Sequence, residues 1–195
     1  MRRILFACAA VVPALVAGCT PAAQPTPSAT PVPTVAAPTL QLMCTPEEGG
    51  TASPCTQAEY DAMVARDKLY DEAKTVLANY RQEFERLARS GAPASDTLLS
   101  STAGEFTEAV KREMDEGFRY EGGTFDVVWV KRLAGEAKAN STVALQSCVD
   151  RSSISIFKGA QEIGLGKPTE QRHFFAPVEG RLKIVAAQNR AVESC

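Results

Sequence analysis

The longest regular pattern of apolar and polar positions lies between residues 56 and 91. Apolar side chains recur there at intervals of three and four, apart from one skip at Asp67, as on one face of a helix. These positions are Tyr60, Met63, Tyr70, Ala73, Leu77, Tyr80, Phe84 and Leu87. Thr56 and Glu59 match a capping box at the start, and Gly91 matches a C-terminal cap. The pattern predicts one long amphipathic helix with a buried face.

A second, shorter helix is predicted to follow. The segment Thr102-Ala103-Gly104-Glu105 matches another capping box, and Gly117 marks the expected end of the helix. Phe106, Val110 and Met114 fall on one side of it. Residues 95–100 are expected to form a helical turn between the two helices.

From residue 118 the pattern changes to period two. Runs of β-branched and aromatic residues predict strands at residues 124–133, 142–150, 172–178 and 181–187, with a short one at 154–157. Glu179-Gly180 predicts a tight hairpin turn between the last two strands. The rest of residues 151–171 is expected to be a glycine-rich loop with a turn at 164–167. Helices followed by an antiparallel meander predict an α+β fold.

The run Val127-Val128-Trp129-Val130 is apolar at four consecutive positions. Such a run predicts a strand that is covered on both faces. We expect one face to pack on the helices and the other to contact a partner protein of the cell envelope or a second copy of the chain. The alternative is that a loop or the C-terminal tail of the same chain covers that face.

The N-terminus has the layout of a secretory signal peptide. Met1-Arg2-Arg3 precedes an apolar run from residue 4 to residue 16, which is too short to span a membrane as a helix. Val16-Ala17-Gly18-Cys19 resembles the lipobox of bacterial lipoproteins. The resemblance implies cleavage before Cys19 and acylation of Cys19. The acylated residue would serve as a membrane anchor, because two or more acyl chains hold a protein stably on a bilayer. The alternative is a plain signal peptide in which Cys19 is incidental.

Residues 20–43 form an uncharged segment with six of the twelve prolines of the chain. Proline at this density favours extended polyproline II, so the segment is expected to act as a spacer of roughly 70 Å. The predicted organisation is therefore a signal peptide at 1–18, a lipidated Cys19 with a disordered tether at 19–43, a disulfide-closed loop at 44–55 and one folded domain at 56–195.

Charge excludes one class of function. Removal of residues 1–18 takes away Arg2 and Arg3, so 19 basic and 23 acidic side chains remain, a net charge of −4. No segment is strongly basic, and we therefore expect no nucleic-acid binding.

Four cysteines remain after Cys8 is assigned to the signal peptide and Cys19 to the anchor: Cys44, Cys55, Cys148 and Cys195. An even number in an exported chain predicts disulfides. Of the three possible pairings we favour Cys44–Cys55, which closes a short acidic loop, and Cys148–Cys195, which joins residues in or beside strands. A zinc site is the alternative, but the spacings lack the close cysteine pairs that such sites use. No metal or cofactor is expected.

The order of elements gives a second resemblance. A long helix, a second helix and a sheet, together with Cys-Val-Asp-Arg-Ser at 148–152 and the ending at 185–195, resemble small actinobacterial lipoproteins with the nuclear-transport-factor-2-like (cystatin-like) fold. Over residues 56–195 the resemblance implies helices packed on a curved antiparallel sheet that forms a cone, and it implies the Cys148–Cys195 pair. The last strand has Arg-Leu-Lys-Ile-Val where that family usually carries a tryptophan.

Candidate chemistry is sparse. Ketosteroid isomerases and scytalone dehydratases, which have this cone, use acid–base groups inside it. Tyr120, Asp126, Asp150 and His173 are the residues available for such a role. A single histidine on a strand is more often structural than catalytic, and Asp150 is expected to anchor a turn at Ser152–Ser153. We therefore predict no enzymatic activity.

The predicted function is a membrane-anchored binding or scaffolding module on the extracytoplasmic face of the membrane. One alternative is a carrier of a small apolar ligand, with Tyr80, Phe84, Trp129 and His173 as the candidate lining of the cone. Another is an isomerase- or dehydratase-like enzyme. A histidine–carboxylate pair in a dry pocket would favour the enzyme, and an open apolar cavity would favour the carrier. A filled domain with an exposed apolar sheet face would favour the binding module.

Overall fold

The helix predicted from the first apolar pattern is the longest element of the fold. The structure is a computed structural model that describes residues 41–47 and 49–195; the predicted signal peptide, Cys19 and most of the tether lie outside these residues. Helix α1 (Gln57–Ser90) begins at the predicted capping box, where the Thr56 amide donates to the Glu59 carboxylate at 2.8 Å. It ends at Gly91, whose left-handed φ of 63° suits glycine. No helix within the described ranges has the length and hydrophobicity needed to cross a bilayer.

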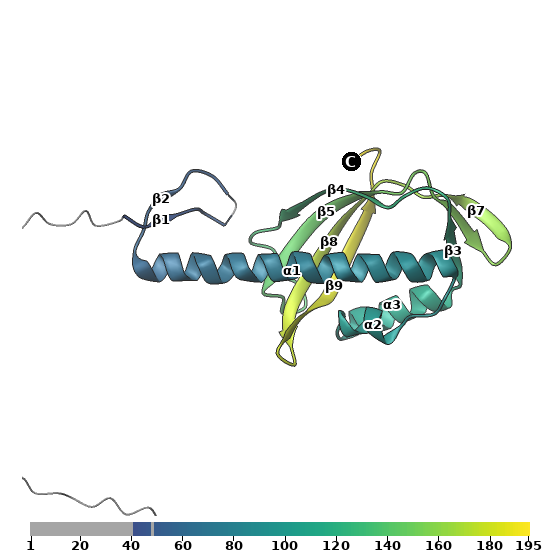
Figure 1. The fold of residues 1–195 in the computed structure, drawn as a ribbon, viewed down its shortest axis with the longest axis horizontal. Coiled ribbons are helices and arrows are strands. Elements are labelled where there is room, and N and C mark those ends of the chain that lie inside the picture. Colours follow the sequence, from purple (N-terminus) through teal and green to yellow (C-terminus); the bar gives the residue numbers. More distant parts are fainter. Residues whose placement is uncertain (1–40, 48) are drawn as a thin grey trace, which may run out of the picture. The chain divides into compact units, whose positions relative to one another are not determined.

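The N-terminal loop is tied to α1. Strands β1 (Met43–Cys44) and β2 (Ser53–Pro54) pair, and the Cys44–Cys55 disulfide closes the loop as predicted. Arg66 donates to the Thr45 carbonyl at 3.2 Å, and the Tyr70 hydroxyl donates to the Glu47 carboxylate at 2.7 Å. The first turns of α1 therefore carry this loop (Figure 1).

Two short helices follow, and the second begins differently from the prediction. Helix α2 (Asp96–Ser100) is capped by Ser95, and helix α3 (Glu105–Asp115) starts at Gly104 without a side-chain cap. The predicted capping box at residues 102–105 is wrong because Thr102 is engaged elsewhere. It forms a parallel bridge with Ile184, and the Ala103 amide donates to the Ile184 carbonyl at 2.9 Å.

The strands form antiparallel sheets, so the α+β prediction is confirmed. The larger sheet has the order β4-β5-β8-β9, and the smaller has the order β3-β6-β7 (Figure 1). The larger sheet consists of β4 (Asp126–Arg132), β5 (Val143–Asp150), β8 (Thr169–Val178) and β9 (Arg181–Ala191). The smaller consists of β3 (Phe118–Glu121), β6 (Ser155–Lys158) and β7 (Gln161–Leu165). Glu179 and Gly180 both have positive φ, 53° and 75°, as expected of the predicted hairpin turn.

Strand β7 replaces part of the glycine-rich loop that the sequence predicted. It pairs with β6 through an irregular register between Ile156 and Phe157, opposite Gly164. Gly164 has a φ of 144°, which lets the strand continue there. All five residues of β7 are exposed, so its sequence lacks the alternation that marks a half-buried strand. The predicted turn at 164–167 is therefore wrong for Gly164 and Leu165.

The main core lies between the helices and one face of the larger sheet, which we call the inner face. Leu77 and Tyr80 of α1 and Val110 of α3 belong to the same cluster as inner-face Leu145, Phe175 and Ile184. These inner-face residues have near-zero exposure.

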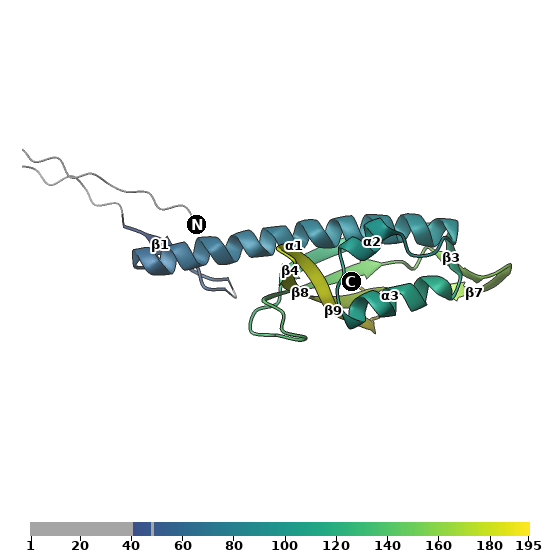
Figure 2. The same ribbon diagram turned by 90° about the horizontal axis from the view of Figure 1, so that it is seen from below.

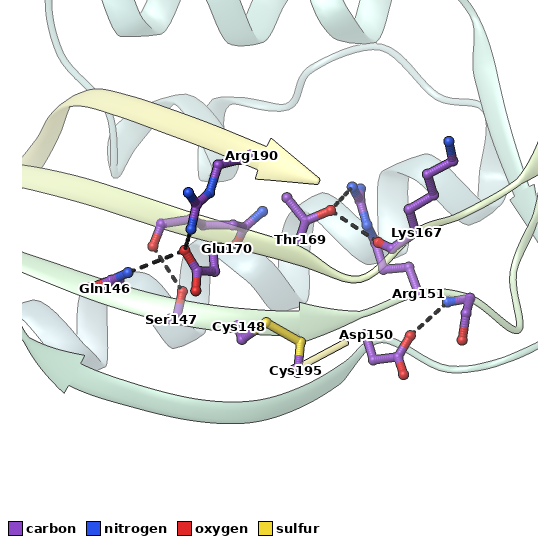
Figure 3. Close-up of a disulfide and its surroundings, with 12 residues drawn as sticks. Gln146, Ser147, Cys148, Asp150, Arg151, Lys167, Thr169, Glu170, Arg190 and Cys195 are labelled. Carbon is purple, nitrogen blue, oxygen red and sulfur yellow. Dashed lines mark hydrogen bonds and ion pairs between the residues drawn. A yellow bond between two sulfur atoms is a disulfide. The ribbon is translucent and has the colours of Figure 1, made fainter. Parts of the chain in front are cut away.

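The opposite face, the outer face, is contacted by two segments of the same chain. The C-terminal tail is joined to β5 by the Cys148–Cys195 disulfide (Figure 3). The loop between β4 and β5 lies below the sheet, away from α1, in Figure 2, and its Glu136 accepts bonds of 3.0 and 3.1 Å from Arg172. Phe174 and Ala144, which pair across β8 and β5 on this face, are buried. A loop and the tail of the same chain therefore contact part of this face.

Strand β4 differs from the prediction of a strand covered on both sides. It is an edge strand that pairs with β5 alone, and a bulge interrupts it between Val127 and Trp129. Val127 is 46% exposed and Val128 is 53% exposed. The expectation of two covered faces is wrong here because the edge position leaves the valine run open.

Candidate functional site

A cavity of about 580 Å³ lies between α1 and the inner face of the larger sheet. Aromatic and aliphatic side chains from α1, α3, the β3–β4 loop and β5 form much of its lining. They include Leu77, Tyr80, Phe84, Phe106, Phe125 and Val149. The volume falls in the range of about 300–1,000 Å³ that is typical of small-molecule sites.

The periodicity of the elements brings these residues together. On α1, Leu77, Arg81 and Phe84 follow one another at intervals of four and three, so they share a helix face. On β8, Gln171 and His173 are two positions apart, so both face the inner side of the sheet. His173 pairs in register with Leu145 and Ala187. The cavity is therefore bounded by one helix face and one sheet face.

Three of the four predicted lining residues meet in the cavity. The Tyr80 ring lies 6.0 Å from the Phe84 ring and 6.3 Å from the His173 ring, between centroids. Trp129 is not among the lining residues. It pairs with Cys148 in the register of β4 and β5, and the Lys131 ammonium lies 4.6 Å from the centre of its ring.

Arg81 is a polar group of this cavity that the sequence analysis did not single out. Its Nη2 donates to the hydroxyl of Ser147 and, at 3.0 Å, to the amide oxygen of Gln171. Its Nε is buried without a hydrogen-bond partner, and none of the ion pairs within residues 41–47 and 49–195 involves Arg81. Burial lowers the pKa of Arg81 to about 10, so the guanidinium stays protonated at neutral pH.

His173 is 3% exposed, and its Nδ1 has no hydrogen-bond partner in the described part of the chain. Burial, assisted by the nearby charge of Arg81, lowers the pKa of His173 to about 3. The imidazole is therefore neutral at physiological pH. Its neighbour across the cavity is the edge of the Tyr80 ring rather than a carboxylate.

The acidic side chains of the lining have other partners. Glu85 accepts a bond of 2.8 Å from Arg89, outside the cavity. Burial raises the pKa of Glu113, and the charge of Arg151 opposes that shift. Arg151 itself donates to Thr169 at 3.2 Å. Lys74, the third cation of the lining, pairs with Asp71 at 3.1 Å, whereas no carboxylate of the described chain pairs with Arg81.

A signal for these charged groups was present in the sequence. Arg81 lies four positions after Leu77 and three before Phe84, inside the apolar stripe of α1. Glu113 is exposed and lies three positions after Val110, beside the stripe of α3. A charged residue at a core-facing position is the feature that marks such a site.

The other residues considered for chemistry lie elsewhere. Tyr120 belongs to a second core cluster with Ile154, and Asp126 accepts a bond from Thr124 at 2.7 Å. The Asp150 carboxylate accepts from the Ser152 amide at 2.9 Å, which confirms the predicted turn anchor and lowers the pKa of Asp150. Among the described residues, no group of three His, Cys, Asp or Glu side chains is arranged to hold a metal ion.

The fold and the cavity define an α+β domain with a largely apolar site that contains a half-buried guanidinium. No protein-family model matches the chain, and no curated protein matches it. Among solved structures, it is similar to the intermembrane space region of the chloroplast protein ARC6, with 9% sequence identity and a TM-score of 0.41. The match covers 62% of this chain and 95% of that one. A similarity at this level carries no inference about function.

Proposed function

We propose that this chain is an extracytoplasmic binding protein that holds a small, largely apolar molecule in the cavity between α1 and the larger sheet. The observation that carries the proposal is the cavity itself, because it has a volume of about 580 Å³ and a lining in which aromatic and aliphatic side chains lie beside a few charged and polar ones. The carrier alternative of the sequence analysis thus has more support than a filled scaffolding domain.

The proposed location is the outer side of a membrane. Two disulfides, Cys44–Cys55 and Cys148–Cys195, support an oxidising compartment. The lipobox-like segment supports an acylated Cys19, and the proline-rich segment supports a spacer between membrane and domain. We also propose a nuclear-transport-factor-2-like fold, which is supported by the order of a long helix, short helices and antiparallel strands.

The anchor is tested with Cys19→Ala in the native host. Detergent-phase partitioning of the wild-type chain and aqueous partitioning of the variant are expected, because the variant has no thiol to acylate. Unchanged detergent partitioning of Cys19→Ala would contradict the anchor.

Binding has more support than catalysis. An isomerase or dehydratase reaction needs a group that takes and returns a proton near neutral pH. The pKa of His173 is lowered to about 3 by burial, which makes it a weak base, and no carboxylate of the described chain is paired with it. Glu113, an acid of the cavity lining, lies near Arg151 instead.

The binding proposal is tested with N-phenyl-1-naphthylamine, an uncharged apolar probe. The full chain, held in phosphatidylcholine vesicles, contains a single tryptophan, Trp129, whose emission transfers energy to probe bound nearby. Saturable transfer with one site per chain is expected. Non-saturable transfer, as given by vesicles alone, would refute the proposal.

A matched pair of variants locates that site. Ala187→Phe places a ring inside the cavity and is expected to weaken probe binding at least tenfold. Gln188→Phe adds the same ring at the next residue, which is exposed and faces the other side of β9, and it is expected to bind as the wild type does. Equal loss in both variants would contradict binding in the cavity.

A second candidate function uses the edge of β4. Val128 and Val130 are 53% and 37% exposed there, and β4 has one free edge within the described chain. We propose a second copy of the chain as the occupant, because two such edges are identical and can pair across a twofold axis. Sedimentation should show a dimer that Val128→Lys dissociates; a monomer at every concentration would refute it.

A further inference from the structure

The charges around the cavity do not balance. Arg81 is protonated at neutral pH, yet its hydrogen bonds go to the neutral acceptors Ser147 and Gln171. Arg81 is half-buried, with its Nε fully buried, and a cation withdrawn from water without a counter-ion is costly, so proteins normally offset it with an anionic group. The carboxylates of the lining, Glu85 and Glu113, lie near other arginines. One positive charge is therefore left facing the apolar space.

From this we infer that the ligand of the cavity is an apolar molecule with one carboxylate head, and that the head binds the guanidinium of Arg81. The inference rests on the proposed binding function and names its ligand class. The geometry suits it because an arginine offers several N–H donors in one plane to the two oxygens of a carboxylate. Its buried Nε has no partner among the described residues.

The rest of the cavity fits the remainder of such a molecule. Leu77, Phe84 and Phe106 provide apolar surface beside Arg81, so a hydrocarbon chain or ring leaves water on binding. His173 adds a second polar group, neutral and 3% exposed, whose Nδ1 is without a partner in the described chain. A neutral imidazole can bond to a carboxylate without adding another charge.

The charge count favours a carboxylate over a phosphate. One uncompensated guanidinium matches one negative charge. A phosphate monoester carries about −1.5 to −2 at pH 7, so part of its charge would stay unpaired in an apolar space. An uncharged ligand would leave the guanidinium of Arg81 without a counter-ion.

The test uses competition against bound N-phenyl-1-naphthylamine on the full chain in phosphatidylcholine vesicles. The competitors are decanoic acid, methyl decanoate and decyl phosphate, compared at equal free aqueous concentration and pH 7.4. Decanoic acid is expected to displace the probe at a concentration at least tenfold below that of methyl decanoate. Equal displacement by acid and ester, or tighter displacement by decyl phosphate, would overturn the carboxylate head while the probe still reports a binding cavity.

Two variants, each of which removes one arginine, test whether the carboxylate head binds Arg81. In Arg81→Met, the concentrations of methyl decanoate and decanoic acid that displace the probe are expected to become nearly equal, a ratio close to one. Arg172→Met removes an arginine from the outer face of the same sheet and is expected to keep the wild-type ratio. A wild-type ratio in Arg81→Met would overturn the assignment. If that variant fails to fold, as judged by circular dichroism, the wild-type acid and ester comparison still decides the ligand class, and the absence of saturable probe binding would instead refute the proposed function.

Discussion

The arginines beside the two faces of the larger sheet differ in the charge of their partners. On the outer face, Arg172 is paired with Glu136 and Arg190 with Glu170 at 3.0 and 2.6 Å. Against the inner face, Arg81 of α1 has neutral hydrogen-bond partners alone among the described residues. The chain thus supplies counter-ions where a charge holds a loop or a strand in place. Their lack inside the cavity is what gives Arg81 its proposed role toward a ligand.

The faces also differ in what covers them. Helices α1 and α3 cover the inner face, while the β4–β5 loop contacts the outer face. The tail is joined to the outer face by the disulfide (Figure 3). The helices form a buried apolar cluster with the inner face beside the cavity, whereas the outer contacts depend on an exposed ion pair and one covalent bond. The outer cover should therefore be easier to remove.

The largest expected effect compares two neighbouring phenylalanines. Phe175 is 0% exposed on the inner face and Phe174 is 1% exposed on the outer face. Truncation of a buried phenylalanine to alanine costs about 3–5 kcal/mol of the free energy of unfolding. We expect Phe175→Ala and Phe174→Ala both to fall in that range in urea denaturation. A loss below about 1 kcal/mol for Phe174→Ala would mean that the outer cover does not stay in place.

The next effect concerns the Cys148–Cys195 disulfide, whose cysteines are 47 residues apart. The loop-entropy relation gives about 4 kcal/mol for a loop of this length, before any strain is subtracted. The double variant Cys148→Ala with Cys195→Ala is expected to lose stability of this order. Hydrogen exchange of the backbone amides around Phe174 is expected to become faster in it. The binding of N-phenyl-1-naphthylamine on the inner face should persist, and its loss would show that the two faces are coupled.

A smaller effect comes from the pH dependence of His173. Its pKa is lowered to about 3 in the folded chain by burial, below the ordinary value of 6.5. The unfolded chain therefore binds more protons between these values, so stability falls as the pH falls below 6.5. We expect a loss of about 2 kcal/mol between pH 6.5 and pH 5.

His173→Phe should remove that loss in denaturation curves measured across the same pH range. Glu113 acts in the opposite direction, because burial raises its pKa and protonation then favours the folded state. Glu113→Gln is therefore included as a control and is expected to steepen the loss. An unchanged pH slope in His173→Phe would contradict the buried neutral imidazole.

Much of the fold could be predicted from local patterns. The capping box at Thr56, the stop at Gly91 and the turn at Glu179-Gly180 depend on residues a few positions apart, and each forms as predicted. Thr102 was misassigned because its bridge to Ile184 is a contact between distant segments. Strand β7 was missed since an exposed strand carries no apolar alternation.

The site was only partly predictable for the same reason. Tyr80 and Phe84 follow from the helix stripe, and His173 follows from strand alternation. Trp129 was placed in the lining by its aromatic character, but the register of β4 sets it beside Cys148. The isolation of Arg81 from carboxylates depends on how three segments meet, and no local pattern encodes that. Its position in the apolar stripe was the visible clue.

The smallest expected effect tests the exposed ion pair of the outer face. Arg172 and Glu136 are each about two-fifths exposed, and such surface pairs contribute less than about 1 kcal/mol because water and salt screen them. Arg172→Met should therefore change the free energy of unfolding by less than that amount, and added salt should shrink the change further. If Arg172→Met instead destabilises the chain as much as Phe174→Ala, then the β4–β5 loop and the outer face form one cooperative unit. The contrast between a helix-packed inner core and a separable outer cover would then be wrong.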